Sequence, residues 1–129
     1  MSSLLRVAVP NKGSLNAKAV ALLHAAGYQQ RTASKELVVT DQEGIEFFYL
    51  RPRDIATYVG SGQLDMGITG RDLLIDSTAP AEEILALGFA RSTFHFAGHQ
   101  TTQSVRDLDG KTIATSYPAV VAKHLANHR

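Results

Sequence analysis

Three short polar segments carry charged or hydroxyl side chains, two of them together with a glycine, and each stands between a predicted strand and a predicted helix. They comprise residues 11–14, 69–72 and 115–118. In an open parallel sheet, such junctions lie at the carboxyl ends of strands, where free N–H groups and the positive end of a helix favour anions. The segments therefore predict a site for a ligand that carries phosphate.

The first segment has the residue types that a phosphate needs. Lys12 supplies a full positive charge, Gly13 allows close backbone approach, and the Ser14 hydroxyl can donate a hydrogen bond. An ordinary turn from strand to helix with an exposed lysine explains the same residues. The spacing is not that of a Walker loop, and no Gly-x-Gly-x-x-Gly fingerprint occurs.

Two further side chains are candidates for contact with a nucleotide. Gly70 permits a tight turn before Asp72, whose carboxylate could accept hydrogen bonds from ribose hydroxyls or a base amine, or could cap its own helix. Arg51 offers a planar pair of donors to a phosphate or a base edge, or could pair with Asp54 at the surface. Arg53 is expected to be solvated.

Composition excludes several other classes of function. Thirteen Lys and Arg against 12 Asp and Glu give a net charge of +1, so no global field favours nucleic acid or membrane. With no cysteine, a thiolate metal site and a cysteine nucleophile are excluded, and His95 and His99 do not form a metal set. No membrane-spanning run or signal peptide is recognised, which predicts a cytoplasmic protein.

The order of predicted elements is that of an α/β protein. A helix capped by Ser14 and followed by Gly27 comes after the first strand, and Pro52 begins a second helix that ends at residues 60–62. Further helices are predicted at 72–76 and 118–128, and Ser104 with Asp107 forms a weak capping box. Strands are predicted at residues 4–9, 36–40, 45–50, 64–69, 84–89, 93–97 and 111–115. The repeated strand, loop and helix indicate a mainly parallel sheet.

A composition shift near Arg91 predicts two units, residues 1–90 and 91–129, joined by a hinge at 88–92. The last predicted helix keeps an apolar face, and no further strand follows it in these residues. Because a parallel crossover normally returns to a strand, we expect the second unit to be incomplete in this chain.

Six strings of residues together resemble one enzyme family. The strings are VAVPNKGSL (7–15), SK (34–35), FFYLRPRDI (47–55), YVGSGQLDMGITGRD (58–72), LGF (87–89) and KTIATSYP (111–118). In this order they resemble ATP phosphoribosyltransferase, the first enzyme of histidine biosynthesis, and especially its long actinobacterial form. The resemblance covers essentially the whole chain. It implies a fold similar to periplasmic binding proteins, with two α/β lobes around a cleft and the second lobe incomplete here.

The resemblance implies transfer of a phosphoribosyl group from phosphoribosyl pyrophosphate to N1 of ATP, with Mg²⁺ and release of pyrophosphate. By it, Lys12, Arg51 and Asp72 contact the adenine nucleotide or its phosphates, and the two cations assist catalysis. The same cleft is shaped by Gly13, Thr69, Gly70 and Leu73. AMP is implied as a competitor and a homo-oligomer as the complete enzyme, and none of these residues is assigned as a metal ligand.

Family members continue well past residue 129. They complete the second lobe, present a loop for the ribose 5-phosphate and, in long forms, add a histidine-binding regulatory domain. The chain is therefore expected to be an N-terminal portion that is inactive alone. The alternative is a non-catalytic module that binds adenine nucleotides or acts as a sensor, which turnover of the two substrates would distinguish.

Overall fold

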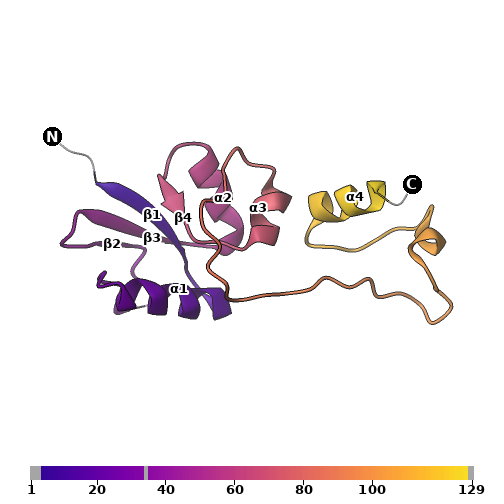
Figure 1. Ribbon diagram of the computed structural model, residues 1–129, viewed down its shortest axis with the longest axis horizontal. Helices are drawn as coiled ribbons and strands as arrows, with labels where there is room; N and C mark the ends of the chain where they lie inside the picture. The colour runs from indigo at the N-terminus through magenta and orange to yellow at the C-terminus, as the bar shows by residue number, and fades with distance from the viewer. Residues whose placement is uncertain (1–3, 34, 128–129) are drawn as a thin grey trace.

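Four strands form one sheet in the computed structural model, which describes residues 4–33 and 35–127 (Figure 1). The strands are β1 (Leu5–Pro10), β2 (Val38–Thr40), β3 (Ile45–Leu50) and β4 (Met66–Gly67), in the order β2-β3-β1-β4. β1 pairs in parallel with both β3 and β4, whereas β2 is an antiparallel edge strand. The predicted α/β class and mainly parallel sheet are confirmed.

Helices cover both faces of this sheet. Helix α1 (Gly13–Ala25) packs on the face that carries Val7, Val9 and Tyr49, and Ala19 lies fully buried between them. Helix α2 (Pro52–Gly60) covers the other face, where Ala8 meets Ile55. Alternate residues of β1 are thus buried on opposite sides, as expected of a central strand. Residues 5–77, which end with helix α3 (Arg71–Ser77), are called the sheet unit below.

Local signals placed the helix ends of the sheet unit with one error. Pro52 occupies the first turn of α2, and Gly27 follows α1 with a φ of +94°, as predicted. Ser14 is not the N-cap of α1: the helix begins at Gly13 and Lys12 is its N-cap, so both lie two residues earlier than predicted. Gly13 starts the helix with a φ of +82°, which a residue with a side chain rarely adopts.

Residues 78–127, called the C-terminal segment below, fold differently. Figure 1 shows a long extended stretch leaving the sheet unit, a turn at the far end and a return to helix α4, which lies beside α3. The elements here are the 3₁₀ helix η1 (Val105–Leu108), which has the predicted Ser104–Asp107 capping box, and α4 (Pro118–Ala126). No helix within the described ranges has the length and apolar character to cross a bilayer.

Three predicted strands of the C-terminal segment are absent. In the sheet unit, the first strand is shifted by one residue from the predicted range 4–9, and two others are shorter than predicted. Residues 84–89, 93–97 and 111–115 carry no strand pairing, because no neighbouring strand among the described residues supplies ladder hydrogen bonds. The predicted strands 36–40 and 64–69 contract to β2 and β4. Two residues of the sequence predictions lie outside the described residues. They are Ser34, from the family string SK, and His128, the last residue of the predicted helix 118–128.

Candidate functional site

The sheet topology brings two of the predicted segments, and the loop that starts with Arg51, to one edge. Strands β3, β1 and β4 are parallel neighbours, so the loops that follow them lie side by side. Hydrogen bonds tie these loops together: the Asn11 N–H donates to the Leu50 carbonyl at 2.8 Å, and the Thr69 hydroxyl donates to the Pro52 carbonyl at 3.0 Å. The predicted meeting of the loops that carry Lys12, Arg51 and Thr69 is therefore present.

The loop after β1 presents an available cation beside an open backbone. Lys12 is exposed, and within residues 4–33 and 35–127 it takes part in no ion pair. A Cβ placed on Gly13 would meet nothing within 4 Å, so the space above this residue is open to a ligand. The arrangement suits an anion at the start of α1.

Arg51 lies at the N-cap of α2, directly after β3. Its Nε lies 3.2 Å from Asp54 Oδ2, which is the surface pairing that the sequence left open as an alternative. The Arg51 side chain is 73% exposed, and an ion pair so open to water contributes little stability. The guanidinium can therefore exchange this partner for a ligand at small cost.

Asp72 lies in the first turn of α3, just after the loop that follows β4. It is not the N-cap, which is Gly70, but its Oδ1 accepts a hydrogen bond from the N–H of Leu73 at 2.8 Å. The alternative that Asp72 caps its own helix is thus only partly correct, because its carboxylate accepts a hydrogen bond in the first turn of α3 although Gly70 is the N-cap residue. A Cβ atom on Gly70 would clash with Asp72 Oδ1. The Asp72 carboxylate can therefore keep its observed position only because residue 70 is a glycine.

Arg31 supports the first loop, and no sequence pattern pointed to this role. Its Nη2 donates to the Asn11 carbonyl at 2.5 Å, immediately before Lys12, and its guanidinium lies 4.4 Å from the centre of the Tyr49 ring. Burial raises the pKa of Tyr49, whose hydroxyl donates to Gln30 at 2.9 Å. Arg31 stands in a loop without periodicity, so only the tertiary structure identifies it.

Arg53 was expected to be solvated, and its side chain is indeed 49% exposed, but its guanidinium also has protein partners that the sequence did not reveal. Its Nη1 lies 3.0 Å from Asp76 Oδ2, and its Nη2 donates to the Ser116 carbonyl at 2.8 Å. These bonds bring Tyr117, from the third predicted segment, toward α3. The Asp76 partner comes from the end of a helix 23 residues along the chain, which no local pattern reveals.

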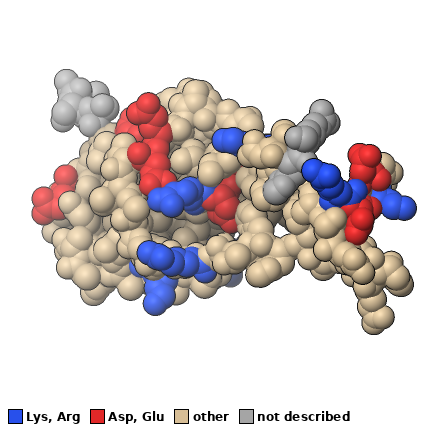
Figure 2. All heavy atoms as spheres, turned by 45° about the vertical axis from the view of Figure 1, so that its right-hand side comes forward, with Lys and Arg blue, Asp and Glu red and all other residues tan. Residues whose placement is uncertain are grey.

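Charge over the rest of the surface is mixed in sign. Figure 2 shows acidic and basic side chains interspersed on the face that it displays. No group of three or more histidine or acidic side chains able to hold a metal ion occurs in the part of the chain that the structure describes. The candidate site is thus a local combination of cations, backbone N–H groups and one carboxylate.

Comparison with known proteins identifies the family. Residues 51–129 match the family model described as "HisG: ATP phosphoribosyltransferase". The ATP phosphoribosyltransferase of Streptomyces avermitilis is 67% identical over 126 residues, which are 96% of this chain and 44% of that relative. The enzyme of the same name from Streptomyces coelicolor is 64% identical over the same shares.

A solved structure is also similar to part of the chain. It is the ATP phosphoribosyl transferase (HisG:HisZ) complex from Thermotoga maritima, with 31% identity over 59% of this chain and 36% of that one, at a TM-score of 0.48. The chain spans less than half the length of the curated relatives that it matches. Because the family model matches more than half of the residues of the chain, the chain belongs to the ATP phosphoribosyltransferase family.

Proposed function

We propose that this chain provides the adenine-nucleotide side of an ATP phosphoribosyltransferase, which transfers phosphoribosyl from phosphoribosyl pyrophosphate to N1 of ATP. The observation that carries the proposal is the joining of three strand-end loops at one sheet edge, with Lys12, Arg51 and Asp72 on them. Membership of the family supports the reaction class. Lys12 and Arg51 act on phosphate oxygens, while Asp72 accepts hydrogen bonds from the nucleoside.

In the proposed reaction, N1 of ATP attacks the anomeric carbon of the ribose. The bond from that carbon to the pyrophosphate oxygen breaks, and pyrophosphate leaves with the electron pair. Charge therefore grows on the departing oxygens, where the cations Lys12 and Arg51 stabilise it. N1 needs only to be positioned, which is the role of Gly13, Thr69, Gly70 and Leu73 in shaping the nucleotide pocket.

Mg²⁺ fits this site as an ion bound largely to substrate oxygens. The described residues hold no cage of three ligands, and Mg²⁺ commonly takes one or two carboxylates together with phosphates and waters. Bound there, the ion would neutralise charge on the leaving pyrophosphate.

The proposal extends to the architecture of the complete protein. The sheet unit, residues 5–77, lies within the first of two lobes similar to those of periplasmic binding proteins, and this lobe extends to a boundary near residues 90–91 with a hinge at 88–92. AMP competes for the nucleotide side, and the complete enzyme is a cytoplasmic homo-oligomer. Because the chain spans 44% of its relatives' length, the second candidate for these residues alone is a module that binds nucleotide without turnover.

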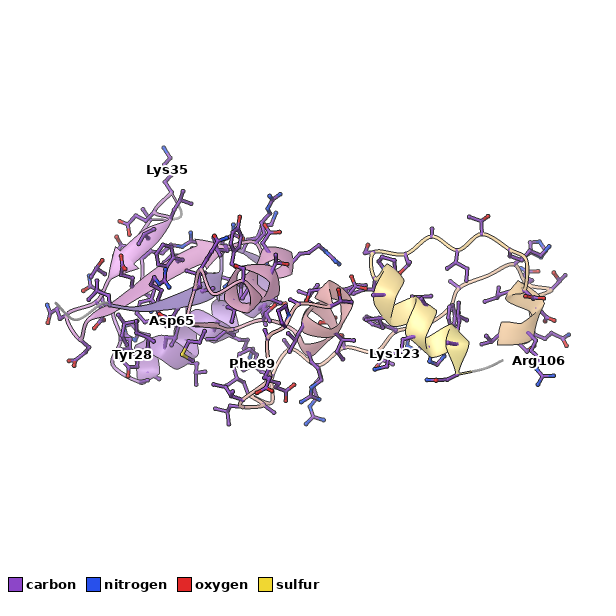
Figure 3. All side chains as sticks on the ribbon, turned by 90° about the horizontal axis from the view of Figure 1, so that it is seen from above. Tyr28, Lys35, Asp65, Phe89, Arg106 and Lys123 are labelled. Carbon is purple, nitrogen blue, oxygen red and sulfur yellow. The ribbon has the colours of Figure 1, made fainter. Side chains whose placement is uncertain are left out.

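Calorimetric titration with AMP tests the nucleotide site. Loss of a hydrogen bond to a charged group costs about 1.5–3 kcal/mol, so Arg51→Ala should weaken AMP binding about tenfold to a hundredfold. Arg106→Ala is the matched control, since Figure 3 shows Arg106 at the end of the C-terminal segment far from the sheet unit. An unchanged dissociation constant for Arg51→Ala contradicts the proposal.

A further inference from the structure

One arginine of the sheet unit joins two loops that are distant in the sequence. Arg31 stands between α1 and β2, and its Nη1 donates to the Glu36 carbonyl at 3.1 Å within the same connection. Its Nη2 donates at 2.5 Å to the Asn11 carbonyl, which lies 20 positions earlier in the loop after β1. The Arg31 guanidinium therefore ties the connection between α1 and β2 to the residue just before Lys12.

The guanidinium of Arg31 is itself held by a buried side chain. Its carbon lies 4.4 Å from the centre of the Tyr49 ring, and Tyr49, on β3, is only 1% exposed. The Tyr49 hydroxyl accepts a hydrogen bond from the Arg31 N–H at 2.9 Å and donates one to Gln30 Oε1 at 2.9 Å. The backbone and the side chain of Arg31 thus both contact one buried residue of the sheet, which restricts the directions open to the guanidinium.

The hydrogen bond from Arg31 sets the direction of a peptide group at the candidate site. The Asn11 carbonyl and the Lys12 N–H belong to one peptide, which is planar and trans, so the two groups point in opposite directions. Because the carbonyl points to Arg31, the Lys12 N–H points away from it. That N–H has no hydrogen-bond acceptor among residues 4–33 and 35–127, which leaves it available to an anion.

The residues next to Lys12 do not fix this peptide. Lys12 is the N-cap of α1, but its side chain makes no capping hydrogen bond. The next residue is Gly13, the residue type with the most backbone freedom. The Asn11 N–H donates to the Leu50 carbonyl, which anchors Asn11 on its N–H side only. The carbonyl side, which continues into Lys12, depends on the contact from Arg31.

A second arginine of the sheet unit provides a contrast. Arg6 lies in β1, at the end of the strand away from the loops of the candidate site. Its Nη2 donates to the Gly62 carbonyl at 3.3 Å, and its Nε lies 3.6 Å from Asp65 Oδ2. Arg6 thus also joins two segments through a backbone carbonyl, but no cation of the candidate site stands beside that carbonyl. It is therefore the matched control for the loss of an arginine side chain.

We propose that Arg31 is a positioning residue of the nucleotide site, which fixes the peptide between Asn11 and Lys12 and so holds the Lys12 charge and N–H where a phosphate binds. This inference rests on the proposed function, because the position of Lys12 matters only if a phosphate binds there. Arg31 acts through Lys12 and does not itself touch the nucleotide. The coupling is reciprocal, so a bound nucleotide in turn stabilises the contacts of Arg31.

Calorimetric titration of the 129-residue chain with AMP measures the effect of Arg31. Arg31→Ala should weaken AMP binding about tenfold, because the Lys12 peptide is then free to turn. Arg31→Lys keeps a charged donor for the Asn11 carbonyl, so it should restore part of the lost affinity. Arg6→Ala is the control and should leave the dissociation constant unchanged.

Double variants show whether Arg31 acts through Lys12. In a Lys12→Ala background, Arg31→Ala should weaken AMP binding by less than about threefold, since the charge that it positions is absent. In an Arg51→Ala background the same substitution should still cost about tenfold, because Arg51 stands on another loop. General damage to the fold would instead weaken binding equally in both backgrounds.

Amide NMR follows the loop itself. Without ligand, Arg31→Ala should shift the signals of Lys12 and Gly13, while the amide of Ala19 in the core stays protected from exchange. In the unsubstituted chain, AMP should slow exchange of the Arg31 amide, which donates to Tyr49. If Arg31→Ala loses the protection of Ala19, the same measurements use Arg31→Met, which keeps an apolar stem beside Tyr49 but has no donor.

Two results overturn the inference, and a third concerns the proposed function. An unchanged AMP dissociation constant in Arg31→Ala shows that Arg31 does not support the site. A tenfold loss that persists in the Lys12→Ala background shows that Arg31 does not act through Lys12. If the unsubstituted chain fails to bind AMP, the proposed function fails, and the Lys12 and Gly13 signals of Arg31→Ala still decide whether Arg31 holds this loop.

Discussion

The sheet unit and the C-terminal segment have similar apolar patterns but very different burial. Every buried hydrophobic residue of the described chain lies in the sheet unit, whereas none of residues 78–127 is buried. Ile55 in α2 is 1% exposed, while Ile84 in the C-terminal segment is 78% exposed. An apolar run therefore becomes core only where another element covers it.

The contrast follows from how the two kinds of secondary structure are stabilised. A helix closes its own backbone hydrogen bonds, so α4 forms in the C-terminal segment without a sheet behind it. A strand needs a neighbour to receive its N–H and C=O groups, and residues 84–89 and 93–97 have none among the described residues. Phe94 instead packs against Tyr117, and the centres of the two rings lie 4.9 Å apart.

The largest expected difference concerns turnover. The sheet unit carries the groups assigned to the nucleotide, but the C-terminal segment offers no strand framework for a second substrate. Because correct placement of two reactants contributes about 7–11 kcal/mol to lowering a barrier, we expect no measurable turnover from the 129-residue chain. The assay uses saturating ATP, phosphoribosyl pyrophosphate and Mg²⁺. A rate near that of a full-length relative would contradict the account.

Removal of one isoleucine side chain from each region should affect stability very differently. Ile55→Ala leaves a cavity under α2 and should lower the free energy of unfolding by about 2–5 kcal/mol. Ile84→Ala should change it by less than about 0.5 kcal/mol, because that side chain already meets water. Urea denaturation followed by circular dichroism measures both. Equal effects would show that Ile84 belongs to a core.

Addition of one methyl group should likewise be costly only in the sheet unit. A Cβ on Gly67 in β4 would lie 2.5 Å from the Cγ2 atom of Ile55 and 3.1 Å from the Cβ atom of Ala8. Overpacking of this kind destabilises by about 1–3 kcal/mol. A Cβ on Gly98 would come no closer than 3.3 Å to Thr102. Gly98→Ala is thus the control and should leave the denaturation midpoint unchanged.

Acid should loosen the contact between the two regions. Burial alone would raise the pKa of Asp76, but hydrogen bonds from Val120, Arg53 and Ala119 outweigh it, so this pKa is lowered. A lowered folded-state pKa means that the stabilisation is present above the unfolded value of about 3.9 and is lost as pH falls through the folded value.

Amide NMR from pH 7 downward measures this loss at Ala119 and Val120. Their signals should stay constant to about pH 4 and shift only below it, when Asp76 takes up a proton. Asp76→Asn should remove the shift. A midpoint above the ordinary range of an aspartate carboxyl would show that Asp76 is held by burial and not by its partners.

The sequence predicted the helices and strands of the sheet unit better than the hydrogen-bond and ion-pair partners of its charged side chains. Local signals are sufficient for Pro52, Gly27 and the run Ile45–Leu50, because each acts on the backbone within a few residues. The partners of Arg53 and Arg31 could not be predicted, since Asp76 and Asn11 reach them only through the tertiary fold. Ser14 failed as a cap because Gly13, with its positive φ, starts the helix first.

The candidate site could be predicted in part. The placement of Lys12 and Asp72 after strands of a mainly parallel sheet could be predicted from the order of elements along the chain, but that these strands are neighbours comes from the structure. Lys35, from one of the family strings, points away from the sheet unit in Figure 3, so its string alone does not place it at the site. The family strings supply the identity of the ligand, which the geometry by itself leaves open.

Amide NMR of the chain titrated with AMP tests the central claim most directly. We predict that the largest shifts occur after β1, β3 and β4, at Gly13, Arg51 and Gly70, with smaller shifts at the start of α4. The amides near Arg106, at the far end of the C-terminal segment, should not move. Shifts confined to the C-terminal segment, or no shifts in the three loops at saturating AMP, would contradict the assignment of the nucleotide site.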